Sequence, residues 1–181
     1  FLNGLDDLVW TMNFGTGADI DGQFRRLGEM RPEAPKMCSE FWSGWFDKWG
    51  ARHETRPAED MVAGIDEMLS KGISFSLYMT HGGTSFGHWA GANSPGFAPD
   101  VTSYDYDAPI NEYGAPTHKY DLLRNVLQKY SDTDLPEVPE PAAQRIEIPE
   151  FTLEESVPIQ AGITKTETSD APTTFEELDM G

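Results

Sequence analysis

Glu40 stands in a run of aromatic residues that would suit the binding of a sugar. It is followed within nine positions by three tryptophans and two phenylalanines, in the sequence SEFWSGWFDKWG at residues 39–50. A carboxylate in such apolar surroundings is costly unless it is paired or used. Because the C–H faces of a pyranose stack on indole rings, Trp42 and Trp45 are candidates for a sugar platform. The plain alternative is that Glu40 caps the next turn and that the tryptophans belong to the core.

The chemistry that fits this pattern is glycoside hydrolysis by paired carboxyl groups. Retaining glycosidases hold two carboxyl groups about 5–5.5 Å apart, one as nucleophile and one as acid/base. Glu40 would be the nucleophile. Asp47 is the only other acid nearby, and we expect it to be structural, either as a cap or paired with Lys48 or Arg52. Tyr78 could donate a hydrogen bond to a carboxylate or a sugar hydroxyl, or could simply be satisfied by the backbone.

A second cluster of polar and aromatic residues occurs in the sequence TSYDYDAP at residues 102–109. Tyr104 and Tyr106 are two positions apart in a segment expected to be extended. We expect their side chains to face opposite ways, so that at most one of them lines a given pocket. Asp105 and Asp107 are expected to cap turns. Trp49, at the end of the first cluster, is expected to pack within its loop.

Composition and spacing argue against several other functions. The formal net charge of −18 disfavours nucleic acid and anionic membrane surfaces as partners. No stretch approaches the roughly 20 apolar residues of a spanning helix. Cys38 is the sole cysteine, which excludes an internal disulfide and a cysteine zinc site. His81 and His88 lack zinc-helix spacing, and the glycine-rich loop at residues 80–89 lacks a phosphate-binding pattern. We expect no metal and no cofactor.

Strands and helices alternate through the first part of the chain. Apolar runs predict strands at residues 8–14, 35–39 and 73–79, and helical spacing predicts helices at residues 19–26, 57–71 and 117–130. Asp19 or Asp21 is expected to cap the first helix, Pro57 to begin the second and Gly72 to end it.

This alternation predicts an α/β fold with parallel βα units. Three units make a poor sheet by themselves, because parallel strands are usually covered on both faces. We therefore expect them to belong to a larger α/β structure. In a βα barrel the chemistry lies at the carboxyl ends of the strands, where Asn13, Glu40 and Tyr78 are predicted to fall.

The composition changes after residue 131. Prolines recur and acidic residues outnumber basic ones, so residues 132–181 are expected to form an extended connector. Ile146, Ile148, Phe151 and Leu153 suggest docked or strand-like pieces within it. The last residues lack a closing element, as if a further domain followed.

Five segments together resemble the catalytic barrel of glycoside hydrolase family 35, the β-galactosidases. The sequences are NFGTG, SEFWSGWFDKWG, YMTHGGTSFG, WAGAN and TSYDYDAP, at residues 13–17, 39–50, 78–87, 89–93 and 102–109. The resemblance extends from residue 11 to about residue 130. It is strong because the five segments occur in order and at family-like spacing.

The resemblance implies specific roles. Glu40 would be the nucleophile at the end of the seventh barrel strand, and Tyr78 would close the eighth strand beside it. Tyr106 would contact the galactose and Trp45 would line the pocket. Trp42 occupies a position that relatives often fill with tyrosine, and it too is a candidate sugar contact.

The resemblance also implies that half of the catalytic pair lies elsewhere. The family's acid/base glutamate belongs to a Glu-Asn-Glu-Tyr-Gly type motif on the fourth strand, and the strands that would supply it are expected to precede Phe1. Residues 1–131 would then be the last three strands of a TIM (β/α)8 barrel, and residues 132–181 a linker toward β-sandwich domains. The expected partners are a β-galactoside substrate and the remaining barrel and β domains, and the chain alone is expected to be inactive.

Other functions fit the same residues. One is a non-catalytic carbohydrate-binding module that uses the aromatic loops without turnover. Another is a β-glycosidase of different sugar specificity, such as a glucosaminidase. An interaction protein is the remaining alternative.

Overall fold

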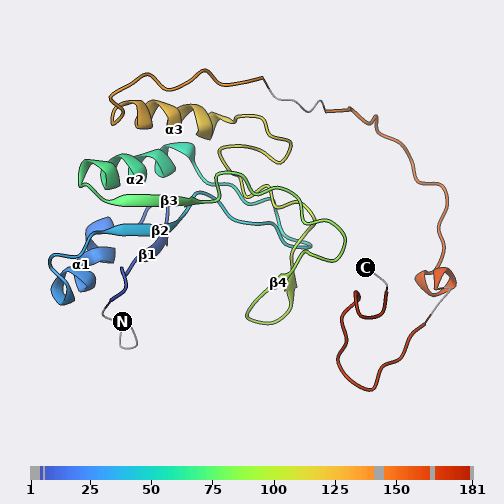
Figure 1. Cartoon of the computed structure of the whole chain (residues 1–181). Helices are drawn as coiled ribbons and strands as arrows, with labels where there is room; N and C mark the ends of the chain where they lie inside the picture. The colour runs from blue at the N-terminus through green and yellow to red at the C-terminus, as the bar shows by residue number, and fades with distance from the viewer. Residues whose placement is uncertain (1–4, 6, 141–144, 164–165, 180–181) are drawn as a thin grey trace. The chain divides into compact units, whose positions relative to one another are not determined.

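The protein, described here by a computed structural model, contains a three-stranded parallel sheet with helices packed against it (Figure 1). The structure describes residue 5 and residues 7–140, 145–163 and 166–179. The sheet has the order β1-β2-β3, formed by Met12–Gly15, Met37–Trp42 and Ser74–Tyr78. Three α-helices, a two-stranded antiparallel ribbon and a 3-10 helix complete the described elements: α1 (Ile20–Met30), α2 (Ala58–Ser70), α3 (His118–Gln128), β4 (Ala92–Asn93), β5 (Ala98–Pro99) and η1 (Ile159–Gly162).

The chain divides into two compact units, Phe1–Ala143 and Gln144–Gly181. In the first unit, the elements follow the order β1-α1-β2-α2-β3, as the alternating pattern predicted. The α/β fold with parallel strands is therefore confirmed. The long loops that follow β2 and β3 gather at the carboxyl ends of the strands (Figure 1).

The helices begin and end near the predicted residues. Asp19 caps α1, because its carboxylate accepts a hydrogen bond from the backbone N–H of Gly22 at 3.0 Å. Helix α1 continues four residues beyond its predicted end, since Leu27 is buried against the core. Pro57 precedes α2, and Gly72 follows it with a φ of 67°, a conformation that glycine adopts readily.

The core lies between the sheet and the helices. Helix α2 packs between β3 and α3 (Figure 1). Its buried face carries Met61, Ile65 and Met68, at the spacing of one helical stripe. Cys38 and Phe41 of β2 pack into the same cluster.

A register irregularity in β2 decides which way Glu40 faces. The pairing of β2 with β3 shifts between Cys38 and Phe41, so these two residues both enter the core although they are three positions apart. In a regular strand, side chains alternate, and residues three apart would lie on opposite faces. The shift directs Glu40 and Trp42 to the face opposite the helical core, where their side chains meet.

The predicted strand boundaries need correction. Strand β2 does not end at Glu40 but continues to Trp42, because Phe41 and Trp42 pair with Leu77 and Tyr78 of β3. Asn13 and Glu40 thus lie within their strands, and only Tyr78 is a terminal strand residue. Residues 8–11 are not in a strand, since the pairing of β1 with β2 begins at Met12.

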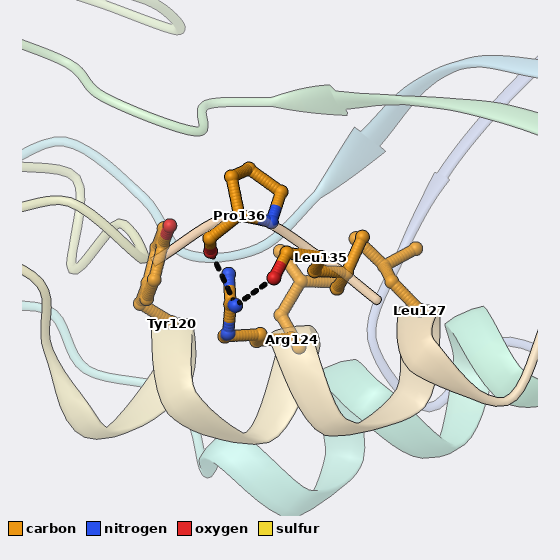
Figure 2. A pocket seen from close by; sticks show the side chains of 6 residues that line it. Tyr120, Arg124, Leu127, Leu135 and Pro136 are labelled. Atoms are coloured by element: carbon orange, nitrogen blue, oxygen red, sulfur yellow. Dashed lines mark hydrogen bonds between the residues drawn. The ribbon is translucent and has the colours of Figure 1, made fainter. Parts of the chain in front are cut away.

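The segment after α3 turns back along that helix and encloses a small cavity. Arg124 of α3 donates hydrogen bonds to the carbonyl oxygens of Leu135, at 2.8 Å, and Pro136. A cavity of about 230 Å³ lies between the helix and this segment, lined mainly by apolar side chains (Figure 2). Its lining residues come from α3 and residues 135–136, and neither Glu40 nor the aromatic residues that follow it are among them.

The second unit has little regular structure. Among its described residues, η1 is the sole helical segment and no strand occurs. Ile146, Ile148, Phe151 and Leu153 are all exposed and lie in no strand, so the expectation of strand-like pieces there was wrong, whereas docking of these residues stays a prediction. Recurrent prolines lack the backbone N–H that a sheet requires. In the described parts of the chain, no helix has the length and apolar character needed to cross a membrane.

Candidate active site

The backbone and carboxylate of Glu40 are both held by neighbouring polar groups. The side-chain oxygen of Asn13 accepts hydrogen bonds from the backbone N–H of Glu40 at 3.1 Å and from the hydroxyl of Ser39 at 2.7 Å. The indole Nε1 of Trp42 donates to Oε2 of Glu40 at 3.1 Å. The half-buried carboxylate therefore accepts from an indole rather than capping a helix. Charge-assisted bonds of this kind orient a carboxylate.

Six aromatic side chains form a continuous group beside Glu40, called here the aromatic wall: Trp42, Trp45, Phe46, Tyr78, Tyr104 and Tyr106. Trp42 meets Trp45 edge to face, with ring centroids 5.8 Å apart. Trp45 stacks on Phe46 at 5.1 Å and lies 6.2 Å from Tyr106. The wall thus joins residues from the β2 end, the β3 end and the loop before α3.

Tyr106 adopts a backbone conformation that the sequence pattern did not predict. Its φ is 63° and that of Asp107 is 50°, both in the left-handed region that non-glycine residues seldom occupy. Tyr104 and Tyr106 therefore do not face opposite ways. Their rings stack with centroids 5.5 Å apart, so both belong to one surface and the expected alternation was wrong.

Two tyrosines of the wall, Tyr104 and Tyr106, have a raised pKa. The pKa of Tyr106 is raised well above its usual range. Burial is the main cause, and the nearby Tyr78 and Glu40 add to it. Burial and the hydrogen bond to Tyr78 similarly raise the pKa of Tyr104. The hydroxyls of Tyr78 and Tyr104 lie 3.3 Å apart. At neutral pH the protonated phenols of Tyr104 and Tyr106 are able to donate hydrogen bonds to a polar ligand.

Two glycines let the loop that carries Tyr104 and Tyr106 approach the sheet closely. An added Cβ at Gly44 would lie 1.7 Å from the carbonyl oxygen of Tyr106, and one at Gly82 would lie 1.6 Å from that of Tyr104. Neither position has room for a side chain. The backbone of this loop therefore packs directly on the segments that follow β2 and β3.

Asp107 does not cap a turn, as was predicted for it, but pairs with a buried cation. Its Oδ2 accepts hydrogen bonds from Lys119 Nζ at 2.6 Å and from the backbone N–H of Arg56 at 2.7 Å. Asp105 accepts a longer bond, at 3.3 Å, from the backbone N–H of Glu112. The carboxylate of Asp107 thus connects segments distant in the sequence, whereas that of Asp105 bonds within its own loop.

Asp47 bonds to a backbone N–H of its own loop, in keeping with the structural role expected of it, but the ion-pair partners predicted for it were wrong. Its carboxylate contacts His53 Nδ1 at 2.7 Å and accepts the backbone N–H of Glu54 at 2.8 Å. The hydrogen bond to Asp47 raises the pKa of His53. Lys48 instead places its ammonium 5.7 Å from the ring centroid of Phe46. Trp49 is 75% exposed, so it does not pack within the loop as expected.

Glu112 is a glutamate that was not among the predicted site residues. It lies in the sequence NEYG at residues 111–114, which repeats the last four residues of the motif expected around the family's acid/base. Its two carboxylate oxygens accept hydrogen bonds from Thr84 Oγ1 and, at 2.6 Å, from Ser103 Oγ. These bonds tie the loop after β3 to the loop before α3. The sequence match alone could have identified it as a candidate.

A cavity of about 250 Å³ opens beside the tryptophans, lined by Gly15, Thr16, Trp42, Gly44, Trp45 and Arg56. It has both polar and apolar lining groups. Among the residues that the structure describes, His, Cys, Asp and Glu side chains form no group of three or more suited to a metal ion.

The chain is similar to a family of sugar-cleaving enzymes and to its curated members. The sequence profile of glycosyl hydrolases family 35 matches residues 3–130. The chain is 43% identical to the beta-galactosidase-1-like protein of Mus musculus over 139 residues, which are 76% of this chain and 22% of that protein. It is 40% identical to the beta-galactosidase of Homo sapiens over 159 residues, 88% of this chain and 23% of that protein.

A bacterial relative extends the match through the second unit. The beta-galactosidase of Xanthomonas manihotis is 35% identical over 179 residues, which are 96% of this chain and 30% of that protein. The chain thus spans between about a fifth and a third of the length of these relatives. Since the family profile covers well over half of its residues, the chain belongs to glycosyl hydrolases family 35.

Proposed function

We propose that this chain supplies the nucleophile half of the active site of a retaining β-galactosidase. The observation that carries the proposal is the carboxylate of Glu40, which accepts the indole N–H of Trp42 and lies beside the aromatic wall. An oriented carboxylate next to stacked rings suits attack on a bound sugar. The relatives reported above are named as β-galactosidases, which makes a galactoside the first candidate substrate.

The proposed reaction is a double displacement. Glu40 attacks the anomeric carbon of a terminal β-D-galactosyl unit while a second carboxylic acid protonates the departing glycosidic oxygen. The same second group then takes a proton from water, which attacks the anomeric carbon and breaks its bond to Glu40. Two inversions give a product of retained configuration.

The second carboxylic acid, in this proposal, lies outside the chain. Glu112 is the one glutamate of this sequence that stands in a run like the family's acid/base motif. Both of its carboxylate oxygens already accept hydrogen bonds from hydroxyl groups. That engagement favours a role in holding the loops together. The chain by itself is then inactive, and its partners are the rest of the barrel and the following β domains of the whole protein.

Four aromatic residues are proposed to hold the sugar. Trp45 and Trp42 would offer indole faces to the C–H surface of the ring. Tyr78 and Tyr106 would donate hydrogen bonds to sugar hydroxyls, which is consistent with the raised pKa of Tyr106. No metal or cofactor has a part in this chemistry.

For the fold, we propose that residues 1–131 are the last three βα units of a (β/α)8 barrel. Residues 132–181 would be the connector to a β domain. The parallel order β1-β2-β3 and the position of the polar and aromatic residues in the following loops support this arrangement. The partial coverage of the relatives is in keeping with it.

The direct test is covalent labelling of the intact protein with a 2-deoxy-2-fluoro-β-galactoside, followed by peptide mapping. The label is expected on Glu40, and Glu40→Gln should lose both labelling and turnover. A label on another residue would refute the assignment. Turnover of nitrophenyl β-galactoside should exceed that of the matching glucosaminide, and binding without any turnover would instead indicate a carbohydrate-binding module.

A further inference from the structure

Lys119 is a buried cation whose hydrogen-bonding capacity is fully used. Its side chain is 5% exposed. The ammonium donates to the carbonyl oxygen of Ser43 at 2.8 Å, to the carbonyl oxygen of Asp107 at 2.8 Å and to Asp107 Oδ2 at 2.6 Å. A lysine has three such donors, so each has an acceptor. A charge removed from water is tolerated only in a complete arrangement of this kind.

The partners of Lys119 belong to the two segments that carry the proposed site residues. Ser43 directly follows β2 and is three positions beyond Glu40. Asp107 directly follows Tyr106. Lys119, from α3, therefore joins the backbone of the proposed nucleophile strand to the backbone of the Tyr106 loop.

The same arrangement includes the end of β3. The hydroxyl of Ser43 donates to the carbonyl oxygen of Met79 at 2.8 Å, one residue after Tyr78. The backbone N–H of Ser43 also donates to the carbonyl oxygen of Tyr78 at 3.3 Å. Three segments that supply the aromatic wall are thus connected within one hydrogen-bond network.

The Tyr106 loop needs such external support. Tyr106 and Asp107 both have positive φ, a backbone state that persists only when its surroundings enforce it. The Tyr106 carbonyl rests against Gly44, and Asp107 Oδ2 also accepts from the backbone N–H of Arg56. Lys119 neutralises the Asp107 carboxylate at the centre of these contacts.

The protonation behaviour of Lys119 agrees with a paired, water-excluded site. Burial lowers the pKa of Lys119, while the hydrogen bond to Asp107 acts in the opposite direction. The pair, rather than water, therefore stabilises the charge.

We propose that Lys119 is a positioning residue that sets the place of the Tyr106 ring relative to the Glu40 carboxylate. It would act on the sugar through Tyr106, without contacting the substrate. The inference rests on the proposed function, because it takes Glu40 and Tyr106 as parts of the galactosyl site. Misplacement of a catalytic group by about 1 Å lowers rates by roughly 100-fold, which is the effect expected when the support is removed.

The test is a double-mutant cycle in the intact protein. The single variants Lys119→Met and Tyr106→Phe and the double variant are compared by kcat/KM for nitrophenyl β-galactoside. Lys119→Met is expected to lower kcat/KM by roughly 100-fold. The double variant should be no more than about threefold worse than the poorer single variant, because Tyr106 is already misplaced. The proposal would be overturned if the two fold-losses in kcat/KM multiply in the double variant. A merely structural loss from Lys119→Met would be equally large with Tyr106 or with phenylalanine at position 106.

Lys129→Met is the matched control. Lys129 directly follows α3 and pairs with Asp66 at 2.8 Å on the exposed side of the protein. The kcat/KM of Lys129→Met should equal that of the unmodified protein. A loss as large as that of Lys119→Met would overturn the positioning role proposed for Lys119.

A second variant keeps the cycle decisive if Lys119→Met does not fold. Asp107→Asn removes the ion pair but retains the backbone carbonyl that Lys119 binds, and it enters the same cycle with Tyr106→Phe. If the fold-losses in kcat/KM of Asp107→Asn and Tyr106→Phe multiply in their double variant, the proposal is also overturned. If Glu40 is labelled normally and the effects multiply, only the role of Lys119 fails. If Glu40 is not labelled, the proposed function itself fails.

Discussion

The indole of Trp42 donates a 3.1 Å hydrogen bond to the carboxylate of Glu40, two positions earlier on the same strand. This contact couples the aromatic wall to the proposed nucleophile. It exists because both side chains lie on the face of β2 opposite the core, where the register irregularity directs them.

Trp42→Phe should lower activity while leaving the fold intact. Phenylalanine keeps an aromatic ring but lacks the N–H that orients Glu40. Hydrogen bonds to charged groups contribute about 1.5–3 kcal/mol, which corresponds to a loss of kcat/KM of roughly 10–100-fold. The measurement is turnover of nitrophenyl β-galactoside by the intact protein. Trp49→Phe, at an exposed indole, should show no loss, and full activity in Trp42→Phe would contradict the role of the contact.

Gly44→Ala should destabilise the protein, whereas Gly28→Ala should not. The new methyl at position 44 would overlap the carbonyl oxygen of Tyr106, only 1.7 Å away, and forced shifts of this kind cost about 1–3 kcal/mol. Gly28 lies within α1 with no atom near an added Cβ, so alanine there should stabilise by up to about 1 kcal/mol. Urea unfolding measures both. Equal stabilities for the two variants would show that Tyr106 does not depend on close approach to Gly44.

His53→Gln should reduce stability more at low pH than at high pH. The hydrogen bond to Asp47 raises the pKa of His53 in the folded protein. The protonated pair therefore stabilises the fold fully below the unfolded pKa of about 6.5, and this contribution is lost as the pH rises through the folded pKa. The effect is small because the side chain is more than half exposed. The test is the thermal midpoint of the unmodified protein and of His53→Gln, measured from below the unfolded pKa of His53 to above its folded pKa. A difference in midpoint that does not change with pH would argue against the His53–Asp47 pair.

Ile65→Ala should be among the most damaging core substitutions. Ile65 is fully buried on the α2 face that packs against the sheet. Removing its side chain should lower the free energy of unfolding by about 2–5 kcal/mol through lost burial and a residual cavity. Asp60→Ala, on the exposed side of α2, should change it by no more than about 0.5 kcal/mol. A small effect at Ile65 would mean that α2 contributes little to the core.

The helices were predictable because their signals are local. Apolar residues at helical spacing, Asp19 as a cap and Gly72 as a terminator are all read within one or two turns. Strand limits were less accurate. The end of β2 at Trp42 depends on pairing with Tyr78, which lies 36 positions later in the sequence and leaves no mark near residue 42.

The sequence by itself determined which chemical groups are present, the alternation that produces a parallel α/β sheet, and the motifs of family 35. Only the tertiary structure decided how those groups meet. The stacking of Tyr106 on Tyr104 follows from a positive φ, and Asp47 pairs with His53 rather than Lys48. Lys119 binds a carbonyl 76 positions away. Such contacts depend on where the folded backbone brings distant segments together, and short-range patterns of residue type carry no information about that.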